Sequence, residues 1–96
     1  MKNLSEEKKN EYISFLFKMI DGSEEEKVGL AICNSCPLEI LEKLSYDESL
    51  NVIETVISND SCTESILKRL FYKSNYFKQM IIEDKKCPLD IINKIL

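Results

Sequence analysis

The apolar residues of the chain follow one pattern three times. In each of the segments 36–44, 62–70 and 87–95, a Cys is followed by Ile four residues later and by Leu or Ile five and eight residues later. Apolar positions with this spacing lie on one face of an α-helix. No segment shows the strict alternation of a half-buried strand. The pattern therefore predicts three helices of the same kind.

A second apolar cluster precedes each of these segments, at residues 30–32, 56–57 and 81–82. The Cys residues that mark the copies are 26 and 25 positions apart, which leaves room for two short helices and a turn in each copy. A single helix pair cannot bury its own apolar face, whereas stacked pairs form a continuous core. We predict first helices at 24–33, 48–58 and 75–84 and second helices at 37–45, 63–72 and 88–96.

A further helix is predicted ahead of the repeats. Ser5 can cap it, and Glu6 and Glu7 suit the positive end of the helix dipole. The expected fold is all-α: a short right-handed helical-repeat solenoid, in which this helix caps three two-helix repeats. We expect a single domain over residues 1–96, with the capping helix at 6–20 and the repeats at 24–46, 47–73 and 74–96.

Local signals also mark the starts of the helices. A Ser followed three residues later by Glu is the pattern of a capping box, and it occurs at Ser23, Ser45 and Ser61. Pro37 and Pro88 are expected at the first helical position, where a missing N–H costs nothing. These signals predict short helices joined by tight turns.

The repeated residues also carry a resemblance to a known family. They are Asn34, Pro37, Leu41 and Leu44 in the first copy, Asn59, Leu67 and Leu70 in the second, and Pro88, Ile92 and Ile95 in the third. In these positions the chain resembles the variant leucine-rich repeat, a short HEAT-like unit of two helices, over about residues 24–96. It departs from the family pattern because Ser35 and Asp60 follow the Asn where Pro is usual. The resemblance implies an all-α solenoid that binds other proteins, and it implies no reaction.

Composition narrows the function classes. The net charge is −4, and residues 1–48 carry eleven acids against six bases. A phosphate backbone requires a positive surface, so we do not expect nucleic-acid binding. The chain has no His, which removes the usual general base and the usual zinc nitrogen ligand. With no catalytic motif in the sequence, we expect no enzyme, no cofactor and no metal.

The cysteines have a structural and a chemical interpretation. Cys33 and Cys36 have the spacing of half a zinc or redox site. Cys36, Cys62 and Cys87, however, occupy equivalent positions in helices that stack about 8–10 Å apart, which is too far for a disulfide. We therefore expect buried structural thiols, although a helix N-terminus can lower a thiol pKa and leaves a reactive Cys33 or Cys36 open.

The expected location is the cytoplasm. Free thiols persist in a reducing compartment. The polar, acidic N-terminus does not resemble a signal peptide, and no apolar run approaches the roughly 18 residues of a membrane helix.

Two surfaces are candidates for binding. Acidic side chains crowd the starts of the first helices, and aromatic rings gather at the turns, where they either contact a partner or fill corners between repeats. Lys43, Arg69 and Lys94 form a column, but each is expected in a last helical turn, where a cation complements the dipole. The candidate partner-binding residues are Glu24, Glu25, Tyr46, Asp47, Glu48, Glu54, Tyr72 and Tyr76. The candidate contacts to a second copy or a partner are Leu89, Ile91, Ile92, Ile95 and Leu96, on the mostly apolar last helix.

Three functions remain open at this point. The first is a non-catalytic helical-repeat module that binds another protein, with a possible homodimer through the C-terminal repeat. The second is a small acidic inhibitor of the phage type, which blocks or mimics nucleic acid on a basic target protein. The third is a redox protein or enzyme that uses Cys33 and Cys36.

Overall fold

The computed structural model describes residues 11, 14–15, 18 and 20–95, with residue 95 described for its backbone only. The predicted capping helix at 6–20 therefore lies largely outside the described residues. All regular structure within the described part of the chain is helical, so the all-α prediction is confirmed. No described helix has the length and apolar character needed to cross a membrane.

The helices begin and end within two residues of the predicted bounds. The third of the first helices differs in one respect, because it opens with a 3₁₀ turn that Ser74 caps by accepting a hydrogen bond from the Tyr76 amide at 3.1 Å. The elements are α2 (Glu24–Ile32), α3 (Leu38–Leu44), α4 (Leu50–Ser58), α5 (Glu64–Lys73), η1 (Asn75–Phe77), α6 (Lys78–Glu83) and α7 (Leu89–Ile95).

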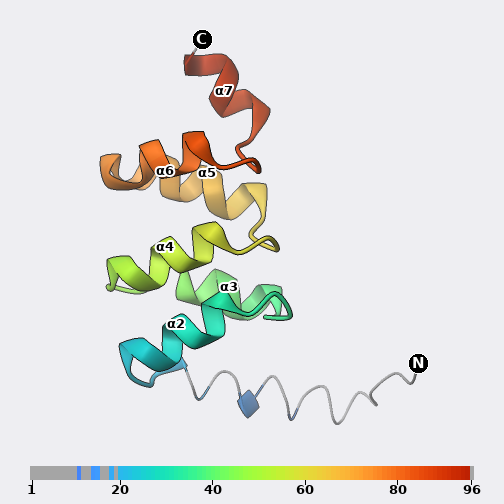
Figure 1. The fold of residues 1–96 in the computed structure, drawn as a ribbon, viewed down its shortest axis with the longest axis vertical. Coiled ribbons are helices and arrows are strands. Elements are labelled where there is room, and N and C mark those ends of the chain that lie inside the picture. Colours follow the sequence, from blue (N-terminus) through green and yellow to red (C-terminus); the bar gives the residue numbers. More distant parts are fainter. Residues whose placement is uncertain (1–10, 12–13, 16–17, 19, 96) are drawn as a thin grey trace, which may run out of the picture.

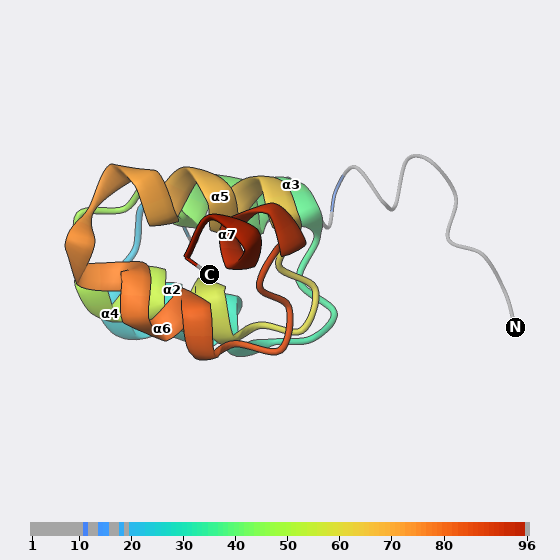
Figure 2. The same ribbon diagram turned by 90° about the horizontal axis from the view of Figure 1, so that it is seen from above.

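The helices form two layers (Figures 1 and 2). Helices α2, α4 and α6 follow one another along the long axis of the molecule and make one layer, and α3 and α5 make the other. Helix α2 packs against both α3 and α4, and α5 packs against α6. Figure 2 places α7 nearer the middle, between the two layers. Helices distant in sequence therefore lie side by side, and one broad face is built from α2, α4 and α6 alone.

The core lies between the two layers. The repeated apolar positions of α3 (Ile40, Leu41 and Leu44) are fully buried. The equivalent positions of α5 are also fully buried, and in α7 the first of them, Ile91, is buried as well. Helix α4 contributes its own apolar side, from Val52 to Ile57. The face of α3 and α5 that the sequence pattern predicted to be buried is therefore the face that packs.

Only one of the three predicted capping boxes forms. Ser23 accepts from the Glu26 amide at 3.2 Å and the Glu26 carboxylate accepts from the Ser23 amide at 2.9 Å. The prediction for Ser45 is wrong, because Ser45 ends α3 and its hydroxyl donates to the Glu42 carbonyl at 2.6 Å. Helix α4 starts at Leu50 and is capped by Ser49, four residues after Ser45.

The third box fails for a similar reason. Thr63 caps α5 by accepting from the Ile66 amide at 3.3 Å, and the Ser61 hydroxyl instead donates to the Asn34 carbonyl. Pro37 is also one position off, since it is the N-cap residue of α3 and not its first helical residue. Its carbonyl still accepts the first helical bonds, from Ile40 and Leu41.

The turns between the helices of a pair share one local geometry. The residues that end α2, α4 and α6 are Cys33, Asn59 and Asp84, and all three have extended backbone angles. The carbonyl of each accepts a hydrogen bond from the amide of the Cys three residues later, at 2.9–3.0 Å. Asn59 is thus equivalent to Cys33, and Asn34 is one position further along the turn.

Candidate functional site

Two adjoining hollows lie on the face built by α2, α4 and α6. One, of about 450 Å³, lies between α2 and α4, and the other, of about 380 Å³, crosses α4 from Ile32 and Asn34 at the end of α2 to Met80 of α6. Glu54 and Thr55 of α4 line both, so the two hollows adjoin along a ridge that the middle helix forms. The stacking of the helices therefore leaves an open, continuous surface that reaches from one end of this layer to the other.

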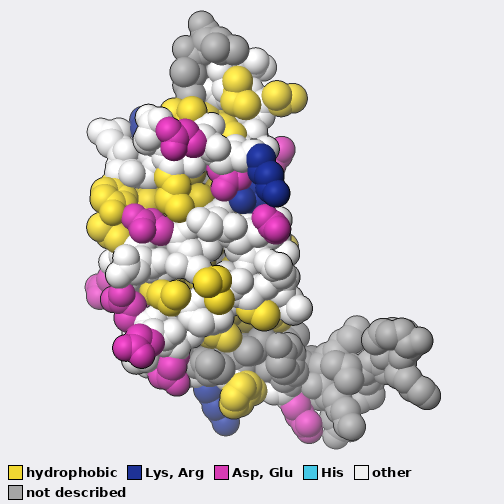
Figure 3. Space-filling view, in the orientation of Figure 1, with side chains coloured by type: hydrophobic (Ala, Val, Ile, Leu, Met, Phe, Trp, Pro, Cys, Tyr) yellow, Lys and Arg dark blue, Asp and Glu magenta, His cyan; other side chains and the backbone are white. Residues whose placement is uncertain are grey.

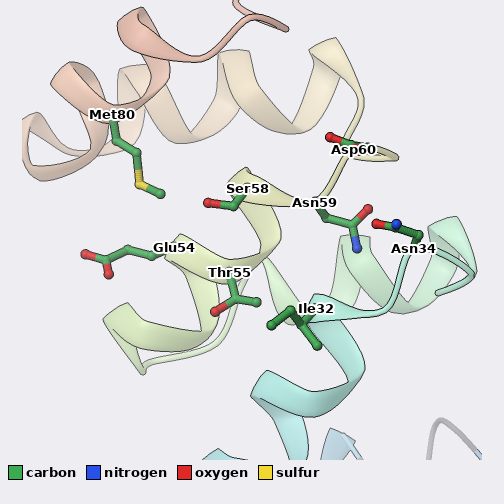
Figure 4. A pocket seen from close by; sticks show the side chains of 8 residues that line it. All are labelled: Ile32, Asn34, Glu54, Thr55, Ser58, Asn59, Asp60 and Met80. Atoms are coloured by element: carbon green, nitrogen blue, oxygen red, sulfur yellow. The ribbon is translucent and has the colours of Figure 1, made fainter.

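Apolar side chains line these hollows: Ile32 is exposed, and Val28 and Met80 are half-buried against the core. Figure 4 shows Met80 of α6 on one side of the α4 ridge and Ile32 of α2 on the other. Ile32 is 68% exposed, and Val28 lines the other hollow half-buried. An exposed large apolar side chain in a hollow is more informative than one on a convex surface, because a partner can bury it.

Acidic side chains border the same hollows. The Asn51 amide donates to the Glu24 carboxylate at 2.7 Å and links α4 to α2. The Tyr76 hydroxyl donates to the Glu54 carboxylate at 2.7 Å and links η1 to α4. The hydrogen bond to Glu54 and the negative charge of that carboxylate raise the pKa of the Tyr76 hydroxyl. Both carboxylates are thus held in place by neutral donors, which leave their negative charge uncompensated.

The lysines of these helices point elsewhere. Lys27 of α2 bonds Asp47 at 2.8 Å, and the Lys78 ammonium lies 5.0 Å from the centre of the Phe71 ring. Among the described residues, none that lines either hollow is a Lys or Arg. Figure 3 shows the result: acidic and hydrophobic side chains share this face, and the basic ones stay at its edges. At one edge Lys85 lies 3.8 Å from Asp60.

The structure brings together only part of the predicted partner-binding set. Glu24, Glu25 and Glu54 line the hollows, and Tyr76 holds Glu54. Glu48 is exposed just before the start of α4, in a separate hollow that Tyr46 and Leu50 also line. This leaves Asp47, Tyr46 and Tyr72, which have partners within the chain.

Asp47 joins two helix pairs instead of facing solvent. Its side chain is 13% exposed and bonds both Lys27 and the Ser49 amide. Burial alone raises its pKa, but the bonds from Lys27 and Ser49 and the Lys27 charge together hold the pKa below its ordinary value. The same hydrogen bond raises the pKa of Lys27. Sequence reasoning missed this because the two residues are twenty positions apart.

Tyr46 and Tyr72 lie under the basic column. The Arg69 guanidinium lies 3.9 Å from the centre of the Tyr46 ring, and the Lys94 ammonium lies 5.2 Å from that of Tyr72. Arg69 also bonds the Glu42 carboxylate at 3.0 Å and the Ser45 hydroxyl. Arg69 and Lys94 therefore link successive second helices. Lys43 and Lys94 lie in the last turns of α3 and α7 as predicted, but the prediction is wrong for Arg69, because α5 continues to Lys73, which takes that place.

The cysteines are free thiols with different exposure. Burial raises the pKa of Cys36 and of Cys62 to about 11 in each case, and it raises the pKa of Cys87 as well. Cys33 is exposed. In the described part of the chain, no group of three or more Cys, Asp or Glu side chains could hold a metal ion.

The side chain of Asn59 holds the turn after α2, a role that the sequence did not predict. Asn59 is 4% exposed, and its amide group donates to the Ala31 carbonyl at 2.7 Å and to the Cys33 carbonyl at 2.9 Å. Its side-chain oxygen accepts from the Ser61 amide at 2.7 Å. Asn59 thereby satisfies two carbonyls at the C-terminal end of α2. It also lines the hollow that Met80 borders (Figure 4).

The predicted contact set on the last helix is divided by the structure. Leu89 is 72% exposed and Ile92 is half-buried, whereas Ile91 lies in the core. The side chain of Ile95, and Leu96 as a whole, fall outside the described residues.

Comparison with known proteins gives no relative from which to transfer a function. No protein-family model, curated protein or solved structure matches the chain.

Proposed function

We propose that the protein is a non-catalytic helical-repeat module that binds another protein. The observation that carries this proposal is the face of α2, α4 and α6, where two adjoining hollows combine exposed apolar side chains with uncompensated carboxylates. Interfaces are commonly built from such an apolar centre with a polar border. The reducing cytoplasm is the proposed location, which the four free thiols support.

We propose the solenoid arrangement of variant leucine-rich, HEAT-like repeats as part of the same function. The shared turn geometry at Cys36, Cys62 and Cys87 and the paired contacts of Arg69 with Tyr46 and of Lys94 with Tyr72 support it. In a solenoid each repeat adds a similar strip of surface, which suits an extended binding face.

The alternative function is a small acidic inhibitor that occupies a nucleic-acid site on a basic target protein. The fixed carboxylates of Glu24 and Glu54 favour it, because a phosphate mimic needs negative charges at set positions. Competition with nucleic acid for the target separates the two functions. Charge mimicry predicts that the chain displaces nucleic acid and that its affinity falls steeply with ionic strength, whereas an apolar interface leaves bound nucleic acid in place.

The test is capture of partners by the full chain, followed by chemical cross-linking and mapping of the cross-linked residues. The matched bait is Thr55→Arg, which places a long cation on the ridge between the hollows without touching the core. The proposal is supported by a protein that the wild-type chain retains in an amount about equal to its own and that the Thr55→Arg bait does not retain. If no protein is retained by either bait, the proposal is wrong.

A further inference from the structure

The arrangement of the two hollows restricts what can occupy both. They adjoin at Glu54 and Thr55 of α4, and their apolar lining residues lie on both sides of this helix, Val28 and Ile32 on α2 and Met80 on α6. A ligand that fills both must therefore present apolar groups at more than one position along its length. Between them it must cross the α4 ridge, where Glu54 carries an uncompensated negative charge.

An α-helix presents such a series of apolar groups with its own backbone satisfied. Residues four and seven positions apart lie on one face of a helix. An extended segment would require backbone hydrogen-bond partners, and the described residues contain no strand edge to supply them. The open form of the surface thus favours a helix lying across α2, α4 and α6.

The acidic residues of the hollows indicate which charged side chains the ligand carries. The acids that line the hollows are Glu24, Glu25, Glu54 and Asp60, and no described lining residue is basic. Lys or Arg beside the apolar stripe of the ligand would meet these carboxylates, while an acidic or phosphate-bearing ligand would be repelled.

We propose that this face binds a basic amphipathic helix of another protein, with its apolar stripe in the two hollows and Lys or Arg over Glu54. The inference rests on the proposed function and names the partner chemistry for it. Ile32 and Met80 contact the apolar stripe, and the carboxylates of α2 and α4 orient the helix and speed its association.

The probe is a synthetic Ala-based helical peptide of about 18 residues, with Leu at one position and again four and seven residues further on, and with Lys on both flanks. One matched peptide replaces Leu by Ser and keeps the charge; another replaces Lys by Glu and keeps the Leu stripe. Calorimetric titration of the full chain is expected to show about tenfold tighter binding of the first peptide than of either control. Equal binding of the Ser peptide would overturn the proposal.

Protein variants locate the binding site. Glu25 and Glu39 are both exposed second residues of their helices, on α2 and on α3 of the opposite layer, so Glu25→Lys and Glu39→Lys change charge and helix dipole alike. We expect about fivefold weaker binding for Glu25→Lys and less than about twofold for Glu39→Lys. Glu54→Gln, which can still accept from Tyr76, is expected to weaken binding about threefold. Equal loss for the two Lys variants would show general charge attraction and overturn the assignment.

The inference and the proposed function fail in different ways. Thermal unfolding first confirms that all variants remain folded. If the basic peptide does not bind while the capture experiment retains a partner that Thr55→Arg loses, the inference is wrong and the binding function stands. If neither the peptide nor any captured protein binds, both are wrong.

Discussion

The guanidinium of Arg69 on α5 lies over the ring of Tyr46, which follows α3, with 3.9 Å between its central carbon and the ring centre. The same pairing recurs one repeat later, where Lys94 lies 5.2 Å from the centre of the Tyr72 ring. A cation over an aromatic face is attracted by the ring quadrupole. These pairs tie successive second helices together at their ends, outside the apolar core.

The Arg69–Tyr46 pair is expected to show energetic coupling. In a double-mutant cycle with Arg69→Met and Tyr46→Leu, we expect a coupling free energy of about 1 kcal/mol by urea unfolding. Arg69→Met alone should cost about 2 kcal/mol, because it also removes the bonds to Glu42 and Ser45. Lys94→Met, at the longer and more exposed pair, is the control and should cost less. A coupling near zero would mean that the rings only fill space.

Asn59 is expected to be a major determinant of stability. Asn59→Ala removes the donors to the Ala31 and Cys33 carbonyls and should lower the free energy of unfolding by about 3 kcal/mol. Asn34 is the control, since it is exposed and only its backbone carbonyl is bonded. Asn34→Ala should change stability by less than about 0.5 kcal/mol. Comparable losses for the two variants in urea unfolding would contradict this assignment.

These two asparagines show what the sequence could and could not predict. The helices were predictable because apolar spacing and the recurring Cys fix both the period and the register. The burial of Asn59 was not, because it depends on which residue ends the helix and on where the carbonyls of the preceding pair lie. The capping boxes at Ser45 and Ser61 failed for the same reason, since the competing caps Ser49 and Thr63 are equally good by composition.

The candidate site was predictable only in its charge. Glu25 and Glu54 stand out in the sequence as acids without basic neighbours at helical spacing, whereas Glu24 has Lys27 three positions further on. Asp47 pairs with Lys27, and the Tyr46 ring lies under Arg69. The sequence could not predict these contacts, because they join separate repeats. The exposure of Ile32 and the partial exposure of Met80 could not be found from periodicity, because it assigns apolar positions to the core.

The Asp47–Lys27 pair makes a pH-dependent contribution to stability. The pKa of Asp47 is lowered in the folded chain relative to the roughly 3.9 of an unfolded one. Its contribution is therefore present above that unfolded value and is lost as the pH falls through the folded pKa. Asp47→Asn should lower the urea midpoint by about 0.5 M at pH 7, and the difference should shrink toward pH 3. Glu48→Gln, on the exposed neighbour, should change neither midpoint; an undiminished difference at pH 3 would contradict the assignment.

Leu89 allows a test of the predicted homodimer. Leu89 and Leu38 are both first residues of second helices, and they are 72% and 49% exposed. If a second copy packs on α7, sedimentation equilibrium should show concentration-dependent dimers that Leu89→Glu converts to monomers. Leu38→Glu, the matched change on α3, should leave association unaltered. A wild-type chain that stays monomeric at high concentration would show that this face has no self-association role.

The cysteines are expected to differ sharply in reactivity. Only the thiolate reacts, and a pKa near 11 lowers the thiolate share of Cys36 and Cys62 about a hundredfold relative to an ordinary thiol near 9. Iodoacetamide at pH 8, followed by mass spectrometry, should therefore label the exposed Cys33 first and these two at least a hundred times more slowly, with the difference abolished in urea. Faster labelling of Cys36 than of Cys33 would contradict burial as the controlling factor.

Peptide binding by the chain labelled at Cys33 then separates the remaining functions. Unchanged affinity fits structural thiols beside a binding face, and loss of affinity would favour the redox interpretation of Cys33 and Cys36.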